Sequence, residues 1–309
     1  MFRTAPLLVL LSLPAWPAEG PLREASAPAI VGNSMPGFYN GYLYSAEPRH
    51  VLTLFAPDGH ELFSLPLAGH GSGRVAIESV AIDSDGTLAL AWQDSPNAGI
   101  DIRNLSGSLV LSIDTGLYVP AHLSFGTDHS LWALGWQRDA AKPTSADQRD
   151  YPILKKYSID GNQIGAYLPK SLFAAGLPPG MSAWQHRAIT VTADRVGVEV
   201  FSGTNGNQRE WVELDLTGNV KGRWRLEEGA EALRVAFTSD DQAYVRRTNY
   251  EAQTTQVVRL NRTTSTWDVV KTADSLLYGA DGDKLVFLTS HDGISHDGPV
   301  LHLSWFPQP

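Results

Sequence analysis

Residues that can bind an anion stand near the starts of predicted strands. They are His122, His186, Arg187 and Arg234, and Trp184 lies two positions before His186. Arginine and protonated histidine donate charge-assisted hydrogen bonds to carboxylates, and an indole ring is a flat surface on which a ligand can stack. We therefore predict that these five residues bind a ligand, and that the ligand is anionic or carries a carboxylate.

A metal-binding pattern is suggested by HDGISHDG at 291–298, where two His-Asp-Gly triplets lie five residues apart. Imidazole nitrogens and carboxylate oxygens are common metal ligands. The spacing matches no metal-binding motif, however, and Asp-Gly is also a frequent turn sequence. The chain has no Cys, which excludes Cys-based zinc sites and disulfides. We expect a turn at this segment, no metal site and no cofactor.

The common catalytic motifs are missing from the chain. It contains no Gly-x-Ser-x-Gly, no His-Glu-x-x-His and no phosphate-binding glycine loop. We therefore assign no catalytic residue, and the sequence favours a binding function over an enzymatic one.

The elements that must position the candidate residues are short strands in a repeated pattern. Two apolar strands flank a tight turn at 79–93, and the same order recurs at 122–137, 235–247 and 276–289. A second hairpin, often turning at Asp-Gly, follows most of these pairs. The first turns of the units fall near residues 40, 85, 128, 194, 240 and 281. Six units of four antiparallel strands predict an all-β fold, a six-bladed β-propeller.

The two ends of the chain complement one another in this arrangement. The last unit has only three predicted strands, the third near 299–306, whereas 27–32 (APAIVG) is a spare apolar strand. An exposed sheet edge invites unwanted pairing with other chains. We therefore predict that the N-terminal strand at 27–32 completes the closing blade.

Two segments carry a family resemblance. VAIDSDGTLALA at 80–91 and KKYSIDGNQIG at 155–165 resemble the repeats of the NHL family of six-bladed propellers. The resemblance covers about residues 50–290, although 189–201 and 257–270 lack the expected glycines. It implies the propeller fold and says little about function, because one fold hosts many functions.

A metal-dependent hydrolase similar to the gluconolactonase-type propellers is the alternative function. In those enzymes the channel holds a divalent metal, and here Glu78 and Asp274 stand near suitable places. The Asn-Gly-containing strands typical of that family are not found.

The predicted topology separates short and long connections. The tight turns within hairpins share one face of the ring, and the longer connections share the other. The long segments 137–150 and 169–187 therefore lie on the same face, which we expect to bind the ligand. Aligned on their turns, the inner strands begin at the channel mouth with Ser79, His122, Arg187 or Ala188, Arg234 and Ser275. Further polar residues at the ends of the second strands are Glu47, Asp94, Arg138 and His291.

The N-terminus has the pattern of a signal peptide. Arg3 precedes an apolar stretch at 5–16 that is too short to span a bilayer. We expect a signal peptide at 1–18 with cleavage within 18–29, and one propeller domain at 28–309. An uncleaved N-terminal anchor is the alternative. Export from a bacterial cell to the periplasm or medium, without stable membrane insertion after cleavage, fits the absence of Cys.

The charge narrows the range of partners. A net charge of −9 with no basic run argues against nucleic-acid binding. The leading hypothesis is an exported, non-catalytic propeller that binds a peptide, protein or small polar ligand on its loop-rich face. The hydrolase described above and a structural surface protein without a ligand are the alternatives.

Overall fold

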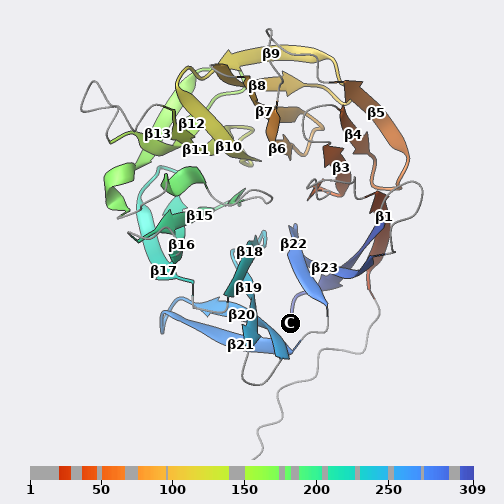
Figure 1. The fold of residues 1–309 in the computed structure, drawn as a ribbon, viewed down its shortest axis with the longest axis vertical. Coiled ribbons are helices and arrows are strands. Elements are labelled where there is room, and N and C mark those ends of the chain that lie inside the picture. Colours follow the sequence, from red (N-terminus) through yellow and green to blue (C-terminus); the bar gives the residue numbers. More distant parts are fainter. Residues whose placement is uncertain are drawn as a thin grey trace, which may run out of the picture.

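The chain forms a ring of six four-stranded antiparallel sheets, which confirms the predicted six-bladed β-propeller (Figure 1). The computed structural model describes residues 21–28, 37–46, 51–66, 76–94, 97–138, 150–173, 178–181, 188–203, 208–226, 230–249, 254–272, 275–291 and 300–309. All statements below concern these residues. Within each blade, strands A to D run from the channel to the outside.

The six blades follow the chain in order. Blade 1 consists of β2 (Gly37–Tyr39), β3 (Tyr42–Ala46), β4 (Val51–Phe55) and β5 (Glu61–Pro66). Blade 2 consists of β6 (Ala76–Ile82), β7 (Leu88–Asp94), β8 (Asn97–Arg103) and β9 (Leu109–Asp114). Blade 3 consists of β10 (Tyr118–Phe125), β11 (Leu131–Gln137), β12 (Pro152–Tyr157) and β13 (Gln163–Pro169).

The second half of the ring repeats this order. Blade 4 consists of β14 (Ile189–Val191), β15 (Arg195–Ser202), β16 (Gln208–Asp215) and β17 (Val220–Arg225). Blade 5 consists of β18 (Ala230–Phe237), β19 (Ala243–Asn249), β20 (Thr254–Asn261) and β21 (Thr266–Thr272). Blade 6 consists of β22 (Leu276–Asp281), β23 (Lys284–His291), β24 (Val300–Pro307) and β1 (Arg23–Pro28). Two short 3-10 helices, η1 (Lys170–Leu172) and η2 (Pro179–Met181), lie between blades 3 and 4.

The N-terminal strand closes the ring as predicted, but it lies earlier in the sequence. β1 pairs with β24, with Arg23 opposite Trp305, so the prediction of 27–32 was wrong in its bounds and the ring begins before residue 28. The Arg23 guanidinium lies 4.5 Å from the centre of the Trp305 ring and donates hydrogen bonds to the carbonyls of Gly41 (2.9 Å) and Pro57 (2.8 Å). One side chain thus fixes β1 to both the last blade and the first.

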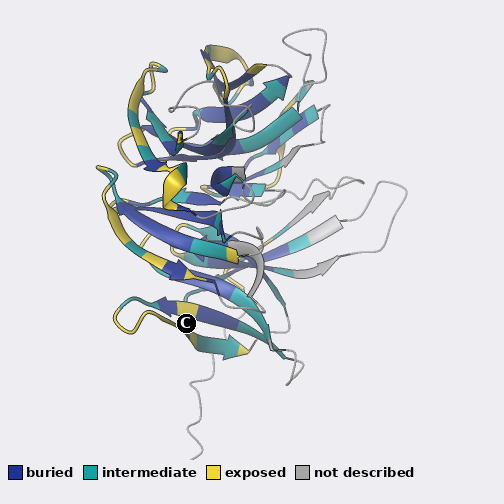
Figure 2. Cartoon of the chain, turned by 60° about the vertical axis from the view of Figure 1, so that its left-hand side comes forward, coloured by how far each residue is buried: buried dark blue, intermediate teal, exposed yellow. Residues whose placement is uncertain are grey.

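Burial follows the position of each strand in its blade. The inner strand β10 is buried at every position, because its two faces pack against neighbouring blades. The outer strands β9 and β17 are mostly exposed, and exposed residues gather in turns and outer strands in Figure 2. Inner strands are therefore nearly continuous apolar runs, whereas outer strands have one face exposed to solvent.

Near the A–B turns, at least one hydrogen bond joins each pair of neighbouring blades. We call this set the inter-blade belt. In ring order it comprises Asn40 Nδ2 to Ile82 O (3.0 Å), His129 Nδ1 to Asp83 Oδ2 (2.6 Å), Val191 N to Ser124 Oγ (3.1 Å), Thr192 Oγ1 to Asp241 Oδ1 (2.6 Å), Ser239 N to Gly282 O (2.9 Å) and Gly41 N to Asp281 Oδ2 (3.2 Å). The turn-bearing face therefore has fixed contacts between blades around the whole ring.

Candidate functional site

Two of the five predicted ligand-binding residues fall in described strands. His122 lies in β10 opposite Leu134 and is 5% exposed, and Arg234 lies in β18, where only its backbone is described. Trp184, His186 and Arg187 lie outside the described residues. The proposed pocket of five residues thus stays a prediction.

His122 does not begin its strand, contrary to the prediction. β10 starts at Tyr118, and its pairing with β11 shifts in register between Pro120 and His122. Ser79 lies inside β6 in the same way, after a shift between Ile77 and Ser79. Alignment on the turns placed the strand starts too late, because β10 and β6 extend several residues farther from their turns than the alignment assumed.

A chain of polar side chains joins blades 2 and 3 at the loop-bearing end. Gln93 Nε2 donates a hydrogen bond to Glu78 Oε1, and Arg138 Nη2 donates to Gln93 Oε1 (3.1 Å). Burial raises the pKa of Glu78, although Gln93 and the charge of Arg138 act in the opposite direction. The amide of Leu123 donates to Ser79 Oγ (3.1 Å), so the residues that follow Glu78 and His122 in the chain are in contact. In the described part of the channel mouth, Glu78, Ser79 and Arg138, which the sequence analysis had named, therefore lie in one region.

The crossover from blade 3 to blade 4 folds back onto these blades. Its helix η2 packs against β11, β12 and β15. A Cβ atom at Gly180 would lie 1.8 Å from the carbonyl oxygen of Gly135 in β11, so no larger residue fits there without a shift. The described part of this long connection is thus closely packed on the blades.

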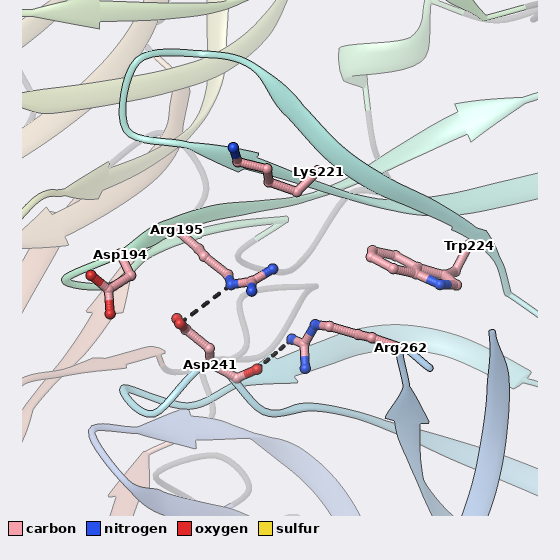
Figure 3. Close-up of a pocket in the computed structure, with 6 residues that line it drawn as sticks. All are labelled: Asp194, Arg195, Lys221, Trp224, Asp241 and Arg262. Carbon is pink, nitrogen blue, oxygen red and sulfur yellow. Dashed lines mark hydrogen bonds and ion pairs between the residues drawn. The ribbon is translucent and has the colours of Figure 1, made fainter. Parts of the chain in front are cut away.

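A pocket of about 510 Å³ opens between blades 4 and 5 on the turn-bearing face (Figure 3). We call it the inter-blade pocket. It is lined by Asp194, Arg195, Lys221, Trp224, Asp241 and Arg262. The first four come from the hairpins of blade 4, and the last two come from turns of blade 5. The sequence analysis did not predict this site, which lies opposite the face it favoured.

A fully buried carboxylate holds the two arginines of the pocket in place. Glu213 is 0% exposed and accepts hydrogen bonds from Arg195 Nη1 (2.8 Å), Arg262 Nε (2.9 Å) and Arg262 Nη2 (2.7 Å). Trp211 Nε1 donates a fourth bond (2.9 Å). Because charged hydrogen bonds in a buried setting are strong and directional, the positions of both guanidiniums are well defined.

Asp241 contributes to the same network. Its carboxylate forms an ion pair with Arg195 Nε (3.4 Å), and its backbone carbonyl accepts a hydrogen bond from Arg262 Nη2 (Figure 3). Lys221 Nζ lies 2.9 Å from Asp215 Oδ2, and this contact helps to hold the pKa of Asp215 well below its usual range.

Two guanidinium nitrogens in the pocket can still donate hydrogen bonds to a ligand. Within the part of the chain that the structure describes, Arg195 Nη2 and Arg262 Nη1 have no hydrogen-bond partner. In Figure 3 the side chains of Arg195 and Arg262 approach one another beside the ring of Trp224. The arrangement can therefore donate to the oxygens of a carboxylate while the indole borders an apolar part of the ligand.

No protein-family model and no curated protein sequence matches the chain. Among solved structures, a Bacteroides fragilis protein described as exported is 11% identical and has a TM-score of 0.55, with 93% of this chain and 95% of that chain covered. A Bacteroides caccae protein of unknown function is 12% identical (75% and 77% covered, TM-score 0.42). Virginiamycin B lyase from Staphylococcus aureus is also 12% identical (91% and 99% covered, TM-score 0.48). The first likeness supports the propeller fold, and membership of the NHL family stays a prediction.

The helices of the described residues are short. None of them is long and apolar enough to cross a membrane.

Proposed function

We propose that this chain is an exported, non-catalytic ligand-binding propeller, and that the inter-blade pocket takes a small ligand with a carboxylate group. The observation that carries the proposal is the pair of guanidiniums fixed by buried Glu213, each with one NH2 group still able to donate. Donors that are already ordered lose little entropy when a ligand binds. The pocket volume also falls within the range of small-molecule sites, about 300–1,000 Å³.

The charges around the pocket define the ligand further. Asp194 and Asp241 also line it, so a ligand with several negative charges is repelled. A small monocarboxylate that carries its own donor group suits the site better, because its carboxylate faces the guanidiniums and its donor faces an aspartate. Amino acids and hydroxy acids have this chemistry.

The loop-bearing face is a second candidate site for the same binding function. His122, Trp184, His186, Arg187 and Arg234 are the residues proposed there, with a peptide or protein as partner. The observation in its favour is the hydrogen-bonded chain from Arg138 through Gln93 to Glu78, which holds two charged side chains at the loop-bearing end of blades 2 and 3.

The experiment is isothermal titration with alanine, lactate and short peptides, using paired variants. Arg262→Lys keeps a cation beside Glu213 but removes the NH2 group at Nη1. Arg223→Lys is the matched control, because Arg223 lies on β17 outside the pocket and pairs with Glu210 (2.7 Å). Loss of a hydrogen bond to a charged group weakens binding by about 1.5–3 kcal/mol, or about 10- to 150-fold. The control variant should bind as the wild type does.

Two other results would favour the loop-bearing face or the hydrolase instead of the inter-blade pocket. Peptide binding that survives Arg262→Lys but is lost with Arg138→Ala identifies the loop-bearing face as the site. A stoichiometric divalent metal that disappears together with a hydrolytic activity in Glu78→Gln supports the hydrolase.

A further inference from the structure

Three side chains of metal-binding type lie together where blades 2 and 3 meet on the turn-bearing face. One oxygen each from Asp83 and Asp85 and a ring nitrogen of His129 all lie within 4.8 Å of one another. We propose that these residues form a divalent-cation site that binds Zn²⁺. One imidazole and two carboxylates suit zinc, and three protein ligands leave a coordination position for water.

The turns of two neighbouring blades bring the ligands together. Asp83 and Asp85 belong to the Asp-Ser-Asp-Gly turn after β6, which Gly86 completes with a φ of 88°. His129 occupies the corresponding turn of blade 3, where its φ of 58° is in the left-handed region. Its ring reaches Asp83 in blade 2, so the site forms only when the blades pack together.

The burial of Asp83 is the second argument for a cation. Its side chain is 6% exposed, and it accepts hydrogen bonds from the Ser84 amide (2.6 Å) and from His129 Nδ1 (2.6 Å). Among the described residues, no lysine or arginine pairs with Asp83, and its partner of opposite-charge type is this imidazole. A buried carboxylate is most favourable beside a positive charge, and a bound divalent metal at this position supplies one.

The surroundings of His129 are rich in negative charge. Asp83, Asp85 and Asp128 all face it, while Lys156 pairs with Asp128 (3.0 Å). The hydrogen bond to Asp83 and these charges raise the pKa of His129, against a smaller opposing effect of burial. A metal at Nδ1 replaces the proton there, so binding releases that proton and strengthens as the pH rises.

The chain contains its own control for this arrangement. His60 Nδ1 lies 2.5 Å from Asp58 Oδ1, so it forms the same kind of pair, but the two side chains are 62% and 72% exposed. Among the described residues, no third ligand joins them from another blade. The pair should bind zinc much more weakly than the site at His129.

The test is titration of the EDTA-treated full chain with Zn²⁺ alone at about pH 6, 7 and 8, with Ca²⁺ as a second cation. We expect one Zn²⁺ per chain, tighter binding at higher pH, and a binding enthalpy that changes with the ionisation enthalpy of the buffer. Ca²⁺ should bind more weakly, because it prefers a shell of oxygens. His129→Asn, which tolerates the left-handed backbone, should weaken zinc binding at least about 100-fold.

His60→Asn should leave the zinc affinity unchanged, and Asp85→Asn is a second variant in case His129→Asn does not fold. The proposal is wrong if His129→Asn and Asp85→Asn bind zinc as the wild type does, if His60→Asn abolishes binding, or if the wild type binds no zinc. None of these results bears on the carboxylate site, because its variants lie between blades 4 and 5.

Discussion

The phenol oxygen of Tyr39 lies 2.5 Å from Oγ of Ser124, which joins blade 1 to blade 3 without passing through blade 2. The same Ser124 hydroxyl accepts a hydrogen bond from the amide of Val191 in blade 4 (3.1 Å). One buried hydroxyl therefore connects three blades in the interior of the ring.

Removal of this phenol should weaken the ring modestly. Tyr39→Phe should lower the free energy of unfolding by about 1 kcal/mol, because one buried hydrogen bond is lost while Ser124 keeps the Val191 amide. Urea unfolding measures the change. Tyr42→Phe in the same hairpin is the control, since its hydroxyl has no partner among the described residues. Equal effects of the two variants would show that the Tyr39 contact contributes nothing.

The closing strand should be sensitive to a single side chain. Arg23→Ala should cost about 2 kcal/mol, because it removes two hydrogen bonds to carbonyls and the contact with the Trp305 ring. Exposed Arg225 on an outer strand offers the control Arg225→Ala, with little expected change. Calorimetry measures both variants.

Deletion of residues 23–28 should lower the unfolding temperature of the whole ring, because β24 then loses its partner strand. Cooperative unfolding that stays unchanged after this deletion would contradict closure of the ring by β1.

The buried carboxylate between blades 4 and 5 should matter far more than a surface one. Glu213→Gln should destabilise the chain by about 3 kcal/mol, since two guanidiniums lose the charge that compensates them. Glu210→Gln removes a partner of Arg223 near the surface and should cost about 1 kcal/mol or less. Chemical denaturation compares the two, and equal losses would show that the Glu213 network does not hold the blades together.

The stability contribution of Glu78 should depend on pH. Burial raises the pKa of Glu78 in the folded state above its ordinary value of 4.5, so ionisation above the raised pKa disfavours folding. Glu78→Gln cannot ionise and should therefore be more stable than the wild type near neutral pH. The advantage should shrink as the pH falls through the raised pKa toward 4.5. Unfolding free energies across this range test the sign, and an advantage that grows on acidification refutes it.

The fold could be predicted from the sequence because its turns have strict chemical requirements. Positive φ angles at Gly86 and Gly161 occur at the Asp-Gly pairs that marked the hairpins. The closing strand was harder to locate, because outer strands have one exposed face. Val110 in β9 is 67% exposed, so apolar content does not identify such strands, and the apolar segment 27–32 was preferred to the polar β1.

The inter-blade pocket could not be located in the same way. Arg195, Glu213 and Arg262 come from two blades and meet only through packing between them. The sequence does hint at a buried charge. Trp211 and Glu213 share one face of β16, and both of these side chains are buried between neighbouring blades. A charged residue at such a position needs hydrogen-bonding partners of opposite charge. The sequence alone does not say which arginines supply them.

The pairing of β1 with β24 has a consequence for biosynthesis. Among the strands of the ring, β1 is synthesised first and its partner β24 is synthesised last. β1 therefore stays unpaired while all the other blades are synthesised. A chain that stops before residue 300 leaves β1 without a partner and the edge of β23 exposed. We therefore expect a chain truncated before β24 to be cleaved by proteases more readily than the full chain, in which β24 covers the edge of β23 and β1 covers the edge of β24.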